Sequence, residues 1–167
     1  MQKFVMQDFA ETIITKLAQA QVEFVVVGGI SAVLQGAPIV TRDLDICYSR
    51  SSDNLRRLAA ALEPFKPQLR DLPAGVPNIF DLRSLEMGAN FTLEVEGQAL
   101  DLLAIMSEIG GYDDILDNAD EMEVAGHQVR VLALADLIRT KRAAGRPKDL
   151  AVIPTLEATL EMQQRQE

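Results

Sequence analysis

Apolar residues along the first part of the chain alternate between helical spacing and short buried runs. Positions three and four apart are typical of a helix, and valine-rich runs bounded by glycine or proline are typical of a buried strand. Ser51 and its neighbours are suited to cap a helix. The pattern predicts a helix over 4–20, a strand over 21–27, a short helix over 30–35, a strand over 44–48 and a helix from 51 to about 62.

The second part of the chain predicts two hairpins followed by two helices. Residues 72–88 are rich in turn-forming residues, and no helix or strand is predicted for them. Strands joined by a short glycine turn form a hairpin, so part of the sheet is expected to be antiparallel. The predicted elements are strands over 91–96, 99–106, 121–124 and 128–132, and helices over 134–143 and 147 to about 162. The order predicts one α/β or α+β domain over residues 1–167, with a mixed central sheet and flanking helices.

The amino-acid composition is consistent with an α/β or α+β globular domain and indicates where the protein is located. The 167 residues are 48% hydrophobic and 25% charged, which is typical of a globular protein. No apolar run approaches the roughly 20 residues that span a bilayer, and the first ten residues lack a signal-peptide core. Cys47 is the only cysteine and cannot form an internal disulfide. We therefore expect no membrane association and a cytoplasmic location.

The chain is acidic, with 25 Asp and Glu against 16 Lys and Arg and a net charge of −9. Such a chain offers few cations to replace the counterions of a duplex, so general DNA binding is not expected. Small triphosphates remain compatible with this charge. A local RNA-binding patch does too, because basic residues gather at 139–142 and 146–148.

Asp43 and Asp45 are the most informative residues. Side chains at i and i+2 of a strand point to the same face, so both carboxylates would converge on one point. Two carboxylates at that spacing repel unless a cation or a proton lies between them. A divalent ion, Mg²⁺ foremost, prefers such oxygen ligands and shares them with phosphates. The alternative is a solvated strand edge.

Asp101 is a third candidate ligand, because a lone carboxylate within the apolar strand 99–106 is costly to bury unless it is paired or bound to metal. The alternative is the exposed face of a half-buried strand.

Gly28 and Gly29 follow the valine strand and would let a phosphate approach backbone N–H groups, or would simply form a tight turn. No Gly-Lys-Ser/Thr follows them, which excludes a P-loop.

Lys141 falls on the inward helix face that Leu134, Leu137 and Ile138 define. An inward lysine could meet a phosphate or the carboxylates, or could extend to solvent at the helix end. Asp149 lies in the first turn of the last helix, where an acid is also favourable for structural reasons. The chain has one histidine, His127, and one cysteine, so it offers too few ligands for a typical zinc site and little basis for Cys–His catalysis.

Together these segments resemble the minimal nucleotidyltransferases of the polymerase-beta-like superfamily, and most of all the abortive-infection-type branch found in toxin–antitoxin pairs. The resemblance covers residues from about 20 to 160. The matching segments are Val27–Ala32, Thr41–Ile46, Leu100–Leu103 and Lys141–Leu150. One departure is Gly29, where the superfamily often has serine after the first glycine; Ser31 lies nearby.

The resemblance implies an NTP held by two Mg²⁺ (or Mn²⁺) ions. Asp43 and Asp45 would bind the ions, Asp101 would be the third acid, and Lys141 and Asp149 would contribute as in the toxin branch. The implied substrate site comprises Gly28, Gly29, Ser31, Arg42, Lys148 and Asp149.

The resulting hypothesis is a Mg²⁺-dependent nucleotidyltransferase acting on RNA, a protein or a small molecule. One alternative is a catalytically inactive relative that binds nucleotide or a protein partner, such as a toxin–antitoxin component. Another is a purely structural subunit. Metal binding without NTP turnover would favour the first alternative, and failure to bind either metal or NTP would favour the second.

Overall fold

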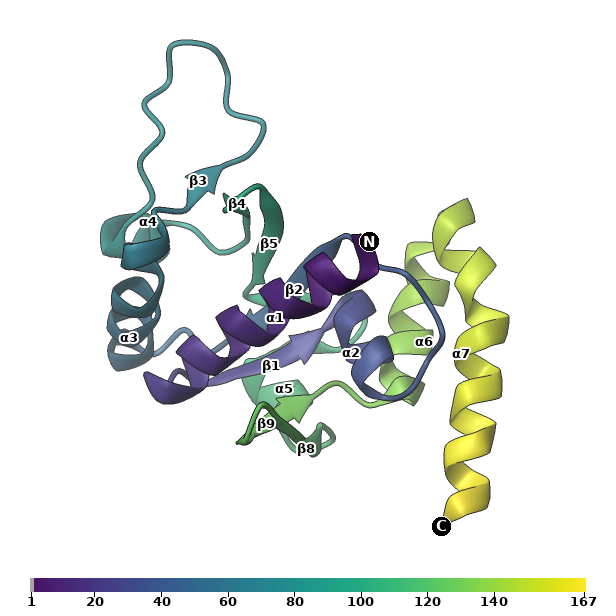
Figure 1. Ribbon diagram of the computed structural model, residues 1–167. Helices are drawn as coiled ribbons and strands as arrows, with labels where there is room; N and C mark the ends of the chain where they lie inside the picture. Colours follow the sequence, from purple (N-terminus) through teal and green to yellow (C-terminus); the bar gives the residue numbers. More distant parts are fainter. Residues whose placement is uncertain (1) are drawn as a thin grey trace.

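The computed structural model describes residues 2–167, and side chains from residue 6 onward, as helices around one large sheet (Figure 1). The helices are α1 (Gln2–Gln19), α2 (Gly28–Leu34), α3 (Ser52–Leu62), the 3₁₀ turn η1 (Glu63–Phe65), α4 (Leu82–Met87), α5 (Tyr112–Leu116), α6 (Leu134–Ala144) and α7 (Pro147–Gln166). The strands are β1 (Phe24–Val27), β2 (Asp43–Tyr48), β3 (Gln68–Leu69), β4 (Phe91–Val95), β5 (Gln98–Leu103), β6 (Ile105–Met106), β7 (Gly110–Gly111), β8 (Asp120–Val124) and β9 (His127–Val131).

The main sheet has seven strands in the order β3-β4-β5-β2-β1-β9-β8. The pairs β2–β5 and β1–β9 are parallel, and the other neighbours are antiparallel. This mixed sheet with flanking helices confirms the predicted fold class. The predicted hairpins are also confirmed, as β4–β5 and β8–β9.

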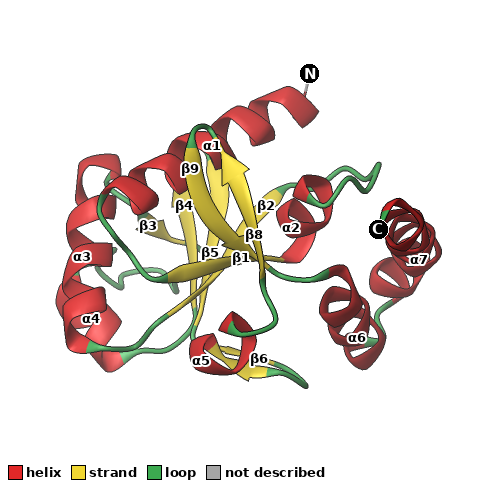
Figure 2. Cartoon of the chain, turned by 90° about the horizontal axis from the view of Figure 1, so that it is seen from below, coloured by secondary structure: helices red, strands yellow, loops and turns green. Residues whose placement is uncertain are grey.

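Two apolar clusters cover the two faces of the sheet. On one face, Val26, Leu44 and Ile46 pack with the apolar sides of α1 and α3. On the other, Val25, Val27 and Cys47 pack with α6 and α7. Figure 2 shows α1 and α3 on one side of the strands and α5 and α6 on the other. The alternation of inward positions along each strand therefore assigns Asp43 and Asp45 to the α6 face.

Several boundaries differ from those predicted. The apolar run 99–106 is not one strand, because β5 ends at Leu103 and the chain turns at the buried Ala104, whose N–H donates to Asn90 Oδ1 at 2.8 Å. Ile105 and Met106 then pair with Gly110 and Gly111 in a separate two-stranded sheet. Periodicity cannot reveal such a break, since both pieces are apolar.

Short helices were the other omission. Within the unassigned stretch 72–88, α4 begins with a capping box between Asp81 and Ser84. Six residues are too few to show helical periodicity. The helix α7 passes Pro154 and ends at Gln166, four residues beyond the predicted end at 162. Among the described residues, no helix has the length and apolar character that crossing a bilayer would need.

Asn54 joins the start of α3 to the loops at the ends of β1 and β2. It is fully buried, its Oδ1 accepts from Glu23 N–H at 2.6 Å, and its Nδ2 donates to the carbonyls of Glu23 and Ser49 at 3.0 and 2.8 Å. We predict that Asn54→Ala lowers the free energy of unfolding by about 2 kcal/mol, because it strands these backbone groups. Urea denaturation measures the change, with the exposed Asn118→Ala as control. Equal midpoints for the two variants would contradict this role.

Candidate functional site

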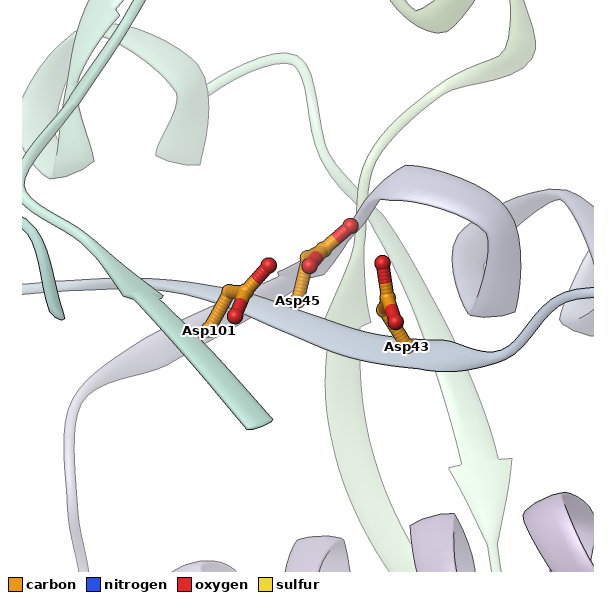
Figure 3. A group of neighbouring side chains, drawn as sticks. All are labelled: Asp43, Asp45 and Asp101. Carbon is orange, nitrogen blue, oxygen red and sulfur yellow. The ribbon is translucent and has the colours of Figure 1, made fainter. Parts of the chain in front are cut away.

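Three aspartates converge on the face of the sheet that α6 covers. Asp43 and Asp45 lie two residues apart on β2, and the parallel register places Asp101 of β5 beside Asp45. One carboxylate oxygen from each of the three lies within 4.8 Å of the others. Figure 3 shows the three side chains projecting to the same side of their strands.

This carboxylate trio fits a divalent cation. Burial, the neighbouring Asp101 and then Asp43 raise the pKa of Asp45 to about 7, so a nearby positive charge would favour its ionised form. Burial also raises the pKa of Asp101, although the guanidinium of Arg70 opposes the change. Three oxygen ligands that need positive charge suit a hard ion such as Mg²⁺ or Mn²⁺.

The glycine turn is built against Asp45. Gly28 has φ +66°, and a Cβ at this position would lie 2.1 Å from Asp45 Oδ2. A Cβ on Gly29 would lie 2.4 Å from Thr41 Oγ1. A larger residue at position 28 would therefore push the Asp45 side chain aside, and one at position 29 would push aside that of Thr41. Ser31 is fully buried, and its hydroxyl donates to the carbonyl of Gly28 at 2.5 Å, which braces the same turn.

A cavity of about 290 Å³ adjoins the trio. Gly28 and Asp45 lie on its wall together with Lys141, Arg146 and Asp149 from the α6–α7 corner. Asn90 and Ser107 add polar groups to the same wall. Lys141 is close enough to Asp45 to lower its pKa, against the larger effects that raise it. The cavity thus has a carboxylate side and a cationic side.

Asp149 organises the cationic side. It is fully buried, accepts from Lys141 Nζ at 3.2 Å, and accepts from Arg146 Nε at 2.5 Å and Nη2 at 3.2 Å. The hydrogen bond from Arg146, and then that from Lys141, lower the pKa of Asp149, so it stays ionised. Pro147 in the first turn of α7 and Gly145 at φ +65° set the tight corner that brings these residues together.

The other predicted substrate residues do not line this cavity. Arg42 is exposed and lines a separate cavity of about 410 Å³ with Asp43. Lys148 is exposed, and neither it, Gly29 nor Ser31 is among the described lining residues of the cavity beside the trio. Cys47 is buried in the core, and burial raises the pKa of its thiol to about 12.

Arg70 is the site residue that the sequence analysis missed. Its Nη2 forms an ion pair with Asp101 Oδ1, across 31 positions of sequence. Arg70 follows β3, a two-residue edge strand that lies between the predicted helix ending at about 62 and the turn-rich stretch 72–88. No local signal marks such a residue, because its position depends on sheet pairing.

A larger cavity, of about 610 Å³, lies between α7 and the loop after α2. The residues on its wall include Gln35, Pro38, Met162 and Gln163, and none of those described carries an ionisable side chain. It therefore lacks groups for acid–base or metal chemistry, and the smaller cavity beside the trio is the candidate active site.

The raised pKa of Asp45 predicts a pH-dependent loss of stability without metal. A carboxyl that binds its proton more tightly in the folded chain stabilises it fully below its ordinary pKa near 3.8, and this contribution is lost as pH rises toward 7. We expect Asp45→Asn to be more stable than the wild type in EDTA, with a gap that widens by about 2 kcal/mol from pH 5 to pH 8. Urea denaturation at both pH values, with exposed Asp117→Asn as control, measures it. A gap that stays constant would rule out the protonated trio.

Comparison with known proteins adds the fold identity. No protein-family model and no curated protein matches the chain. A candidate nucleotidyltransferase from Thermotoga maritima aligns over 100% of this chain and 97% of its own, with TM-score 0.58 and 17% identity. ANT(2″)-Ia in complex with adenylyl-2″-tobramycin aligns over 96% and 92%, with TM-score 0.63 and 14% identity. The lincosamide adenylyltransferase LnuA, lincomycin-bound, aligns over 92% and 96%, with TM-score 0.61 and 15% identity.

These likenesses confirm the nucleotidyltransferase part of the resemblance at the level of fold. The toxin–antitoxin branch and the roles of the individual site residues stay predictions. The chain has the same fold as these nucleotidyltransferases.

Proposed function

We propose that the chain is a Mg²⁺- or Mn²⁺-dependent nucleotidyltransferase that transfers NMP from an NTP to an acceptor hydroxyl. The observation that carries the proposal is that Asp45, a member of the carboxylate trio, lines the same cavity as Lys141 and Arg146. Carboxylates alone would repel a triphosphate, and cations alone would bind it without activating it. A site that carries both signs of charge suits phosphoryl-type transfer.

Each group has a distinct task in this proposal. Asp43, Asp45 and Asp101 would hold the divalent ion, which when bound neutralises phosphate charge and polarises the reacting phosphorus. Lys141 and Arg146 face the cavity and would bind phosphate oxygens, with Asp149 fixing their positions. Asp101, the third carboxylate of the trio, would also help to accept the proton of the acceptor hydroxyl.

The acceptor that we favour is a small hydroxyl compound. Two of the similar structures contain adenylyl-2″-tobramycin and lincomycin. The net charge of −9 also weighs against a polyanionic acceptor. RNA ends and protein side chains remain outcomes of the test. The triphosphate substrate and the single buried thiol are compatible with a cytoplasmic enzyme.

The direct test is incubation with each α-labelled NTP, Mg²⁺ and, separately, total RNA, total protein and a hydroxyl-compound extract. Label transfer to one fraction identifies the acceptor class. The alternative function, a catalytically inactive nucleotide-binding relative or toxin–antitoxin component, is favoured by Gly29 in place of the serine expected from the superfamily. It requires NTP binding with no transfer to any fraction, which would overturn the enzymatic proposal.

Metal and nucleotide together should stabilise the folded chain. We predict that Mg²⁺ with the preferred NTP raises the melting temperature, because both bind only the folded state. Asp43→Ala with Asp45→Ala should abolish the shift while the protein still unfolds cooperatively. The exposed Asp117→Ala serves as a matched control and should keep the full shift. An undiminished shift in the double variant would refute the metal site.

Lys141→Met separates phosphate binding from stability. Methionine keeps most of the aliphatic stem, and Asp149 retains its two hydrogen bonds from Arg146, so we expect little change in melting temperature. The dissociation constant of the NTP should rise about tenfold, or about 1.4 kcal/mol, through loss of one charged contact. Isothermal titration measures it, with Lys16→Met on α1 as control. Unchanged affinity would exclude Lys141 from the triphosphate site.

A further inference from the structure

Arg70 belongs to a row of residues that crosses the sheet to the aspartates. The β3–β4 register pairs Leu69 with Leu93, and Arg70 N–H donates to the carbonyl of Thr92 at 2.9 Å, which continues that pairing by one residue. Thr92 pairs with Asp101 and Asp101 pairs with Asp45. Cross-strand partners share a face of the sheet, so Arg70 projects on the same side as the trio.

The loop that carries Arg70 is fastened at its base. Figure 1 shows the chain leaving β3 in a long loop before it returns to α4. Asn78 closes this loop, because its Oδ1 accepts from Leu69 N–H at 2.8 Å and its Nδ2 donates to the carbonyl of Leu69 at 3.2 Å. The residue directly before Arg70 is therefore held on both its backbone groups. Hydrogen bonds to Thr92 of β4 and to Asn78 of the loop therefore fix the backbone at Arg70, and this fixed backbone places its side chain beside Asp101.

The ion pair itself is sheltered from water. The side chains of Arg70 and Asp101 are 28% and 19% exposed, and Arg70 Nε is buried without a hydrogen-bond partner among the described residues. Exposed surface pairs gain little from their charges, but a partly buried pair is screened much less by solvent and salt. The guanidinium thus supplies a permanent positive charge at the third carboxylate.

Charge balance then limits what the trio can bind. Arg70 neutralises Asp101, and the two remaining carboxylates, Asp43 and Asp45, carry two negative charges. Lys141 and Arg146 are engaged by Asp149 and face the cavity. One divalent ion balances Asp43 and Asp45, whereas a second would meet a net positive surrounding. A fixed cation within a few ångströms disfavours a further cation by Coulomb repulsion.

We propose that Arg70 takes the place of a second metal ion, so that the nucleotide-free chain binds a single divalent ion at the trio. The inference rests on the metal site of the proposed function and specifies it further. Arg70 is a positioning residue in this scheme, since it acts through Asp101. Its guanidinium orients one oxygen of Asp101 and leaves the other directed toward Asp45.

The test is Mn²⁺ titration of the nucleotide-free chain at pH 8, followed by the electron paramagnetic resonance signal of free Mn²⁺. We expect one site in the wild type. Arg70→Gln should gain a second site or bind the first at least tenfold more tightly. Arg70→Lys, which restores the charge, should behave as the wild type. Arg139→Gln is the matched control, since it breaks an ion pair with Asp136 on α6 and should leave one site unchanged.

Two sites in the wild type, or Arg70→Gln indistinguishable from it, would overturn the inference while leaving the proposed function intact. Arg70→Lys matching Arg70→Gln would also overturn it, because charge would then not be the cause. No Mn²⁺ binding at all would overturn both. Should Arg70→Gln fail to fold, Arg70→Met tests the same point, because methionine keeps the aliphatic stem and removes the charge. It should gain a second site or bind the first more tightly, and one site of unchanged affinity in this variant would overturn the inference.

Discussion

Repulsion among three carboxylates is the constraint on which the arrangement of this protein depends. Asp43, Asp45 and Asp101 are brought together by sheet register, and the backbone cannot separate them without breaking β2–β5 pairing. The repulsion therefore destabilises the folded state, and the raised pKa of Asp45 is one consequence of it. Destabilising arrangements of this kind are found mainly at functional sites, where the surrounding residues hold them in place.

Two sets of cations meet this charge from opposite directions. Arg70 approaches from the β3 edge and pairs with Asp101 directly. Lys141 and Arg146 approach from the α6–α7 corner, but the buried Asp149 holds them across the cavity. Both cations therefore form their ion pairs with Asp149, and the structure shows no ion pair of either with Asp45 among the described residues. The buried anion therefore keeps opposite charges apart, which maintains an open polar site.

The extent to which the sequence predicts this site follows from the range of the interactions involved. The Asp43–Asp45 pair depends only on strand alternation, and Lys141 only on helical spacing, so a local pattern is enough to assign each of them to one face of its own element. The neighbourhood of Asp45 and Asp101 depends on a parallel pairing across 56 positions that no local pattern specifies. Arg70 is harder still, because a two-residue edge strand has no periodicity, and its partner Asp101 is set by the registers of two strand pairs.

The glycine pair illustrates how a motif gains meaning from its contacts. Read alone, Gly28-Gly29 suggests either a phosphate-binding turn or a plain strand-to-helix turn. In the structure each glycine makes room for a side chain of the β2 segment, Asp45 for Gly28 and Thr41 for Gly29. Because glycine has no side chain, the Asp45 carboxylate can lie directly against the turn. Glycine here serves the position of Asp45 first, and any approach of a phosphate to the backbone uses space that the aspartate already shapes.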